Sequence, residues 1–159
     1  GKGDGIMLEQ SFSEVYAKFK LHFYRSVFSR FQNREASLTT VETFCMEIIN
    51  ALKNPTINEF ASFAQISPPN AAYKVNKLIQ KGYVQKIQSA TDKREYHLEP
   101  TQKYHDYYNI SYTYLHTVMQ RIEERFSPQE IAQLESMLQI ISGELMPEIP
   151  ALDQSHPNI

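Results

Sequence analysis

The sequence predicts a mostly α-helical chain with one small β-hairpin in its middle, an α+β fold. First, apolar residues recur at the 3.6-residue spacing of an amphipathic helix on both sides of that hairpin. Second, the spacing changes to 2 over residues 83–87 and again over residues 95–98, as it does in strands. Third, Ser or Thr precedes Glu by three residues at several helix starts, which is the capping-box pattern. A length of 159 residues, 42% hydrophobic and 21% charged, is ordinary for one globular domain.

Two helices are predicted before the middle of the chain. The first covers residues 11–31, where Ser11 and Glu14 form a capping box. The second covers residues 41–52, with Thr39 as its cap. A proline shortly after it ends the helix, because proline disfavours helical backbone at the residue before it.

Two short helices joined by a tight turn follow. The first opens at Thr56, and the second begins with Ser67 as N-cap and Pro68 at the first helical position. Gly82 stands where a left-handed C-cap is needed to end the second helix. Because the hairpin comes next, the order of elements is that of a winged helix-turn-helix.

The C-terminal third is predicted to be helical again. A long helix capped by Thr101 runs to about Phe126, and a last helix capped by Ser127 carries a heptad-like apolar stripe. Gly1 to Gly5 is glycine-rich and resembles an expression scar. The predicted organisation is a scar and disordered start (1–9), an N-terminal dimerisation helix (10–36), the winged module (37–101), C-terminal dimerisation helices (102–146) and an irregular tail (147–159).

The chemistry of the second short helix and of the hairpin tip fits DNA. In this motif the second helix enters the major groove, where Asn can pair with adenine and an Ala methyl can meet a thymine methyl. Tyr and Lys side chains reach phosphate oxygens. The candidate DNA-binding residues are Ser67, Pro69, Asn70, Ala72, Tyr73, Asn76 and Lys77 in the helix and Thr91, Lys93 and Arg94 in the hairpin. Asp92 is expected to orient Arg94, because a guanidinium held by a carboxylate loses less freedom on binding.

The distribution of charge favours a polyanionic partner. Residues 65–103 hold seven basic and three acidic side chains, a net charge of +4, whereas the whole chain carries −2. The remaining residues therefore carry −6. A basic module in an acidic chain indicates that nucleic acid binds to one face.

The sequence resembles the MarR-type transcriptional regulators over roughly residues 10–146. The segments that carry this resemblance are Ile57-Asn58-Glu59-Phe60-Ala61, the Ile66-Ser67 turn, Leu78-Ile79-Gln80-Lys81-Gly82-Tyr83-Val84 and Asp92-Lys93-Arg94-Glu95. The resemblance implies a homodimer, held by its terminal helices, that binds a roughly palindromic double-stranded DNA site, most often as a repressor. It also implies that Arg94 enters the minor groove with Asp92 as its partner.

The terminal helices support a dimer independently, because they carry more apolar surface than a small winged module can cover. The residues expected in the dimer interface are Phe12, Phe19, Leu115, Ile122, Leu134, Leu138 and Ile141.

An effector pocket is a further expectation, since the resemblance implies small aromatic or anionic effectors bound beside the long helix. That helix is rich in tyrosine, whose ring is apolar and whose hydroxyl can form hydrogen bonds. The expected pocket residues are Tyr104, Tyr107, Tyr108, Phe23 and Phe44. Packing of the tyrosines in the core or in the dimer interface is the alternative.

Other functions are less well supported by the sequence. The single cysteine, Cys45, excludes an internal disulfide and fits a reducing, cytoplasmic setting, and its reaction as a redox sensor remains an alternative. His105 and His116 share a helix face but lie roughly 16 Å apart, too far to share one ion, so metal sensing is a weaker alternative and no metal is expected. No cofactor, no enzymatic activity and no membrane segment are expected. A dimeric protein-interaction module without DNA binding also remains open.

Overall fold

The computed structural model describes residues 2–30 and 38–150, apart from the side chains of residues 2–4, 30 and 107. Within these ranges the chain forms seven helices and two strands. The elements are α1 (Lys2–Arg30), α2 (Thr40–Ala51), α3 (Ile57–Ala64), α4 (Pro68–Gln80), β1 (Val84–Gln88), β2 (Tyr96–Pro100), α5 (Gln102–Tyr108), α6 (Ile110–Arg125) and α7 (Pro128–Glu144).

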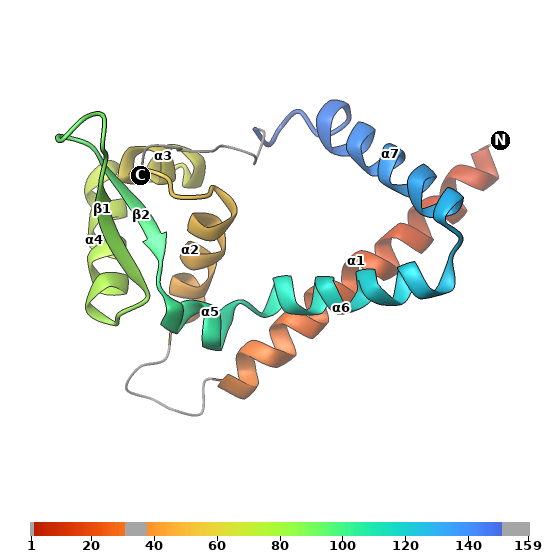
Figure 1. Ribbon diagram of the computed structural model, residues 1–159, viewed down its shortest axis with the longest axis horizontal. Coiled ribbons are helices and arrows are strands. Elements are labelled where there is room, and N and C mark those ends of the chain that lie inside the picture. Colours follow the sequence, from red (N-terminus) through yellow and green to blue (C-terminus); the bar gives the residue numbers. More distant parts are fainter. Residues whose placement is uncertain (1, 31–37, 151–159) are drawn as a thin grey trace.

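The molecule has two parts, a winged module and a helical arm (Figure 1). The winged module contains α2, α3, α4, the hairpin and α5, whereas the arm contains α1, α6 and α7 and projects away from it. Helix α1 packs along α6, and α6 contacts α7. This architecture confirms the mostly helical fold with a small hairpin wing.

The core lies in the winged module. Phe60, Ile49 and Leu78 come from three different helices and are each completely buried, together with Leu98 from β2. Burial of a side chain of this size contributes about 1.5–3 kcal/mol, so these residues fix the helices against the hairpin. The arm contributes little to this core, and in α7 the described residues include none that is buried.

Local capping determines where the helices of the module begin. Thr39 and Thr56 each accept a hydrogen bond from the amide of the Glu three residues later, and each Glu side chain returns one to the cap. Ser67 caps α4, as predicted. Gln65, in the turn before α4, has a left-handed backbone with φ 57°. Gly82, which follows the end of α4, is also left-handed with φ 83°.

The hairpin is antiparallel, and Val84 pairs with Pro100 while Gln88 pairs with Tyr96. Its strands lie about one residue later than predicted. The Leu98 amide donates to the Pro55 carbonyl at 2.7 Å, and the His97 imidazole contacts the Asn54 carbonyl at 2.9 Å. These contacts attach the hairpin to the connection between α2 and α3, and so fix the direction of the wing.

The N-terminal helix differs from the prediction. Helix α1 begins at Lys2, so residues 2–9, which were expected to be disordered, are helical. Ser11 and Glu14 therefore lie inside the helix and do not cap it. Gly3 and Gly5 each disfavour a helix by about 1 kcal/mol, and so they favoured the prediction of a disordered start. Once a helix has formed, however, each residue added to its end contributes one more hydrogen bond, and α1 extends through both glycines. Residues 31–37 of the predicted dimerisation segment lie outside the described residues.

The long helix predicted after Thr101 is also divided. Asn109, with ψ 50°, separates α5 from α6. Asn tends to leave helical geometry because its side chain competes for backbone groups.

Residues 147–150 are irregular, as predicted for the tail, and residues 151–159 lie outside the described range. In the described residues no helix is long and apolar enough to span a bilayer.

Candidate nucleic-acid interface

Helix α4 presents a polar face to solvent. The Ser67 hydroxyl accepts from the Asn70 amide at 3.2 Å, and this cap fixes the first turn. Ala71, Val75 and Leu78 face the core. The opposite face carries the residues predicted to bind DNA. Ala72 is half-buried there. The exposed residues are Ser67, Pro69, Asn70, Tyr73, Asn76 and Lys77.

Tyr73 and Lys77 form a pair one turn apart on this exposed face. The Lys77 ammonium lies 4.8 Å from the centre of the Tyr73 ring. Its hydrogen bond with the Tyr73 hydroxyl raises the pKa of Lys77. A charged amine and a phenol side by side suit a phosphate oxygen.

The tip of the wing holds Arg94 against Asp92. The guanidinium donates to both carboxylate oxygens of Asp92, with N–O distances of 3.2 Å and 3.4 Å. The Arg94 amide donates to the same carboxylate at 3.0 Å. These bonds lower the pKa of Asp92. The Arg94 side chain remains 92% exposed, so it is oriented and still accessible.

Ser89 is a structural residue of the wing that the sequence analysis missed. Its hydroxyl accepts from the amides of Thr91 and Asp92, at 3.2 Å and 3.3 Å. The Gln88 amide group also donates to the Lys93 carbonyl at 2.7 Å. A serine hydroxyl often accepts from backbone amides two or three residues later in a turn, so the sequence held a signal for this role. The tip is therefore an ordered loop.

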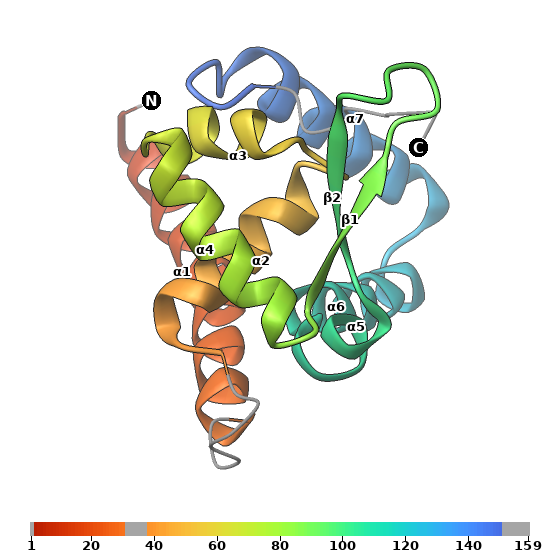
Figure 2. The ribbon, with the colours of Figure 1, turned by 90° about the vertical axis from the view of Figure 1, so that its left-hand side faces the viewer.

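Helix α4 and the hairpin lie on the same side of the molecule (Figure 2). The structure thus brings the helix residues and the wing residues of the predicted interface onto one face. Thr91, Lys93 and Arg94 are all exposed at the tip.

The C-terminal end of α4 is anchored to α2. The Lys81 ammonium donates to Glu42 at 2.7 Å, and the Thr39 amide donates to the same oxygen at 2.9 Å. Burial raises the pKa of Glu42, but these hydrogen bonds outweigh it and the net shift is downward. The ion pair therefore ties the C-terminal end of α4 to α2.

The predicted effector residues come from α1, α2 and α5. Tyr104 and Tyr108 belong to the core, and the Tyr104 hydroxyl donates to Glu47 at 3.1 Å. Phe44 is half exposed on α2, and Phe23 is partly buried on α1. The side chain of Tyr107 lies outside the described residues. Packing in the core therefore explains Tyr104 and Tyr108.

The predicted dimer residues all lie on the arm. Phe12, Leu115, Leu134 and Leu138 are exposed. The partly buried members of the set are Phe19, Ile122 and Ile141.

Cys45 is buried, and this burial raises the pKa of its thiol. The described residues contain no group of three or more His, Cys, Asp or Glu side chains that could hold a metal ion.

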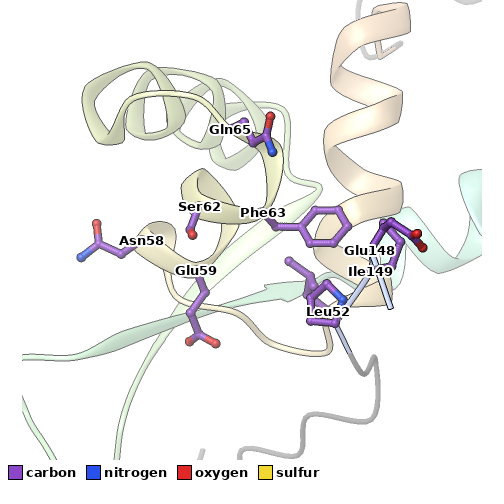
Figure 3. A pocket seen from close by; sticks show the side chains of 9 residues that line it. Leu52, Asn58, Glu59, Ser62, Phe63, Gln65, Glu148 and Ile149 are labelled. Carbon is purple, nitrogen blue, oxygen red and sulfur yellow. The ribbon is translucent and has the colours of Figure 1, made fainter. Parts of the chain in front are cut away.

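A hollow of about 630 Å³ lies between α3 and residues 148–150. Figure 3 shows the Phe63 ring extending toward Ile149, with Leu52 nearby. Its lining includes acidic side chains and no basic ones, so it does not extend the basic face.

The fold and this face together define a winged helix-turn-helix architecture, which is common among DNA-binding proteins. The sequence model of the MarR family matches residues 38–96, the stretch that holds α2, α3, α4 and β1. A comparison with curated protein sequences gave no match.

Solved structures resemble the chain over most of its length. The FabT protein of Streptococcus pneumoniae, solved in complex with DNA, has 17% identity and a TM-score of 0.57, covering 89% of this chain and 99% of that one. A MarR family protein from Bacillus stearothermophilus has 14% identity and a TM-score of 0.60, covering 91% and 97%. The transcriptional regulator Tm0710 of Thermotoga maritima has 16% identity and a TM-score of 0.55, covering 89% and 95%. At such identities the likeness shows the fold.

Proposed function

We propose that this protein is a homodimeric, sequence-specific regulator of transcription that binds double-stranded DNA in the cytoplasm. The observation that carries the proposal is the shared face of α4 and the wing (Figure 2). On it, Asn70 and Asn76 are base-reading groups, whereas Lys77 and the oriented Arg94 are cationic groups for the backbone and a narrow minor groove. Repression is the simplest mode, because a bound dimer blocks access to the DNA it covers.

The arm supports the homodimer. Helix α7 has several apolar residues, yet none of those described is buried within one chain. Between α6 and α7 runs a groove of about 540 Å³, lined by Ile122, Leu134 and Leu138 among others. The apolar side chains of α7 are not buried by their own chain, and the arm of a second copy is the surface that best buries them. Two recognition helices about 34 Å apart then fit adjacent major grooves.

A small effector is the remaining part of the proposal. A cavity of about 430 Å³ lies between α1 and the junction of α5 and α6. His22 stacks on Tyr114 with ring centres 3.7 Å apart, and its buried Nδ1 has no hydrogen-bond partner among the described residues. Arg121 also lines this cavity. A cation and an unpartnered ring nitrogen suit a small aromatic or anionic molecule.

Two measurements test this function. Band shifts with the DNA upstream of the protein's own gene, over a salt titration, should show binding that weakens steeply as salt rises. Sedimentation at micromolar concentration should show a species of twice 18.5 kDa. A dimer that binds no DNA would favour the protein-interaction module, whereas a compact monomer would contradict the dimer.

A further inference from the structure

The base of the wing is attached to a strained turn of the main chain. In the connection between α2 and α3, Lys53 and Asn54 both have left-handed backbones, with φ 54° and φ 60°. Side chains other than glycine seldom adopt this conformation, and two in succession need support from neighbouring groups. Part of that support comes from β2, where His97 forms a backbone bridge with Thr56. The direction of the wing therefore depends on how β2 holds this turn.

The His97 imidazole supplies the side-chain part of this support. The residue is 3% exposed, and its Nδ1 lies 2.9 Å from the carbonyl oxygen of Asn54. A carbonyl oxygen can only accept a hydrogen bond, so Nδ1 must carry the proton of the neutral ring. Nε2 is then the atom that gains a second proton when the ring becomes charged.

Nε2 of His97 faces a carboxylate of the wing. It lies 3.8 Å from Oε1 of Glu95, whose side chain is 44% exposed. In the neutral ring Nε2 is an acceptor, so two acceptors face each other. In the charged ring Nε2 carries a proton that points toward an anion, and this contact opposes the cost of charging a buried ring. Histidine ordinarily changes its charge between about pH 5 and 8.

The other titratable groups around His97 are less able to respond to such a proton. Strand β1 and helices α2 and α3 pack against β2. The titratable side chains on them and on the connection are Glu42, Cys45, Glu47, Lys53, Glu59 and Lys86. The three carboxylates of this set already accept hydrogen bonds from other groups. Burial raises the pKa of Cys45, so its thiol stays neutral where histidine titrates. The two lysines are exposed.

Glu95 belongs to a groove of about 600 Å³ between the wing and the start of α3. The charged residues of its lining are Lys86 and Arg94 on one side of the balance and Asp92 and Glu95 on the other, so its formal charge is zero. A proton on His97 offsets the charge of Glu95 and leaves the surroundings of this groove positive. Positive charge next to Arg94 favours the phosphates of DNA.

We propose that His97 is a positioning residue of the wing and that DNA binding takes up a proton from solvent at its Nε2. The Nδ1–H group holds the turn at Asn54 at any pH, whereas the Nε2–H group binds Glu95 and offsets its charge at the tip. Because phosphates stabilise the added charge, bound DNA and bound proton favour each other, and affinity rises as the pH falls. The linkage rests on the proposed DNA-binding function, whereas the contact between His97 and Glu95 does not.

The contact is tested without DNA by NMR of the imidazole nitrogens between pH 5 and 8.5. The His97 signals are those that are missing from His97→Asn. At high pH Nδ1 should carry the only ring proton, and Nε2 should gain one as the pH falls. In Glu95→Gln this gain should occur about 1 pH unit lower, because the attracting charge is gone. A ring that stays neutral down to pH 5, the opposite tautomer, or the same titration in Glu95→Gln and the parent would each overturn the contact.

The linkage is tested by fluorescence anisotropy with DNA at one fixed salt concentration. The parent should bind about tenfold more weakly at pH 8 than at pH 6, since each linked proton contributes up to tenfold per pH unit. His97→Asn keeps an N–H group at the position of Nδ1 but cannot gain a proton, so its affinity should change by less than about threefold. The matched control is His116→Asn, at an exposed histidine of α6, which should keep the parental pH dependence. The same pH dependence in His97→Asn and the parent would overturn the linkage.

His97→Leu tests the positioning role, because leucine is also bulky but has no N–H group for the Asn54 carbonyl. At pH 8 it should bind DNA about tenfold more weakly than His97→Asn does. Equal affinities of these two variants would overturn the positioning role. A parent that binds no DNA at any pH would contradict the proposed function and the linkage together, while the NMR titration decides the contact by itself.

Discussion

Lys103 donates a hydrogen bond to the carbonyl oxygen of Lys81, with the Nζ–O distance at 2.8 Å. A cation on the first turn of α5 thus caps the C-terminal end of the recognition helix, where the helix dipole favours positive charge. The same ammonium lies 4.6 Å from the centre of the Tyr83 ring. Next to it, the Thr101 hydroxyl donates to the Gly82 carbonyl at 2.6 Å. The helix that leads to the arm and the helix proposed to read DNA therefore share one junction.

Replacing Lys103 should weaken this junction. Lys103→Met keeps most of the apolar stem but removes the hydrogen bond and the cation above Tyr83. We expect the free energy of unfolding to fall by about 1–2 kcal/mol, measured by urea titration. Lys86→Met, on the exposed face of β1, is the control and should change stability by under about 0.5 kcal/mol. Equal stability of the two variants would mean that the junction does not hold the helix end.

Acid should release the anchor between α2 and α4. Because the pKa of Glu42 lies below its ordinary 4.5, the ionised carboxylate stabilises the folded state. This contribution is complete above pH 4.5 and is lost as the pH falls through the lowered value. Glu42→Gln has no such titration, so its stability should fall less steeply below pH 4.5 than that of the parent. Parallel stability curves from thermal melts between pH 3 and 6 would rule out this role.

The wing should contribute affinity without contributing stability. Arg94→Ala should weaken DNA binding by about 1–3 kcal/mol, because it removes a groove contact. The melting temperature should hardly change, since exposed ion pairs contribute under about 1 kcal/mol. Asp92→Ala should weaken binding less, because it only orients Arg94. Fluorescence anisotropy at one fixed salt concentration compares both variants with the parent, and parental affinity in Arg94→Ala would mean that the wing does not contact this DNA.

The entry of the recognition helix should favour A·T pairs. No Arg or Lys lies among residues 68–73, so bidentate contacts to guanine are not available there. Asn70 is exposed and suits adenine, and the methyl group of Ala72 suits thymine. Selection from a random DNA pool should therefore return AT-rich half-sites. GC-rich half-sites would show that other residues determine the preference.

Local signals explain which parts of the fold were predictable. The caps at Thr39, Thr56, Ser67 and Ser127 need only residues within three positions, and each helix begins where its cap predicts. The exposed face of α4 follows from the same local periodicity. The pairing of Asp92 with Arg94 spans two residues and was predictable for the same reason.

Features that depend on distant contacts were not predictable. The burial of Tyr104 and Tyr108 results from packing against α2 and Tyr83, which periodicity within one helix cannot reveal. The division of the long helix at Asn109 is different, because the tendency of Asn to leave helical geometry is a local signal, although a weak one.

The proposed function requires that one face, formed by α4 and the wing, binds DNA as a unit. The most direct test removes two charges from this face with Lys77→Ala and Arg94→Ala in one protein. Its matched control removes two charges from the arm with Lys18→Ala and Arg25→Ala, both exposed on α1. By anisotropy against salt, the first variant should lose roughly 30-fold or more in affinity, and its salt slope should fall by about 2. The control should stay within about twofold of the parent. Equal losses in the two variants would contradict the claim, because binding would then follow overall charge and not this face.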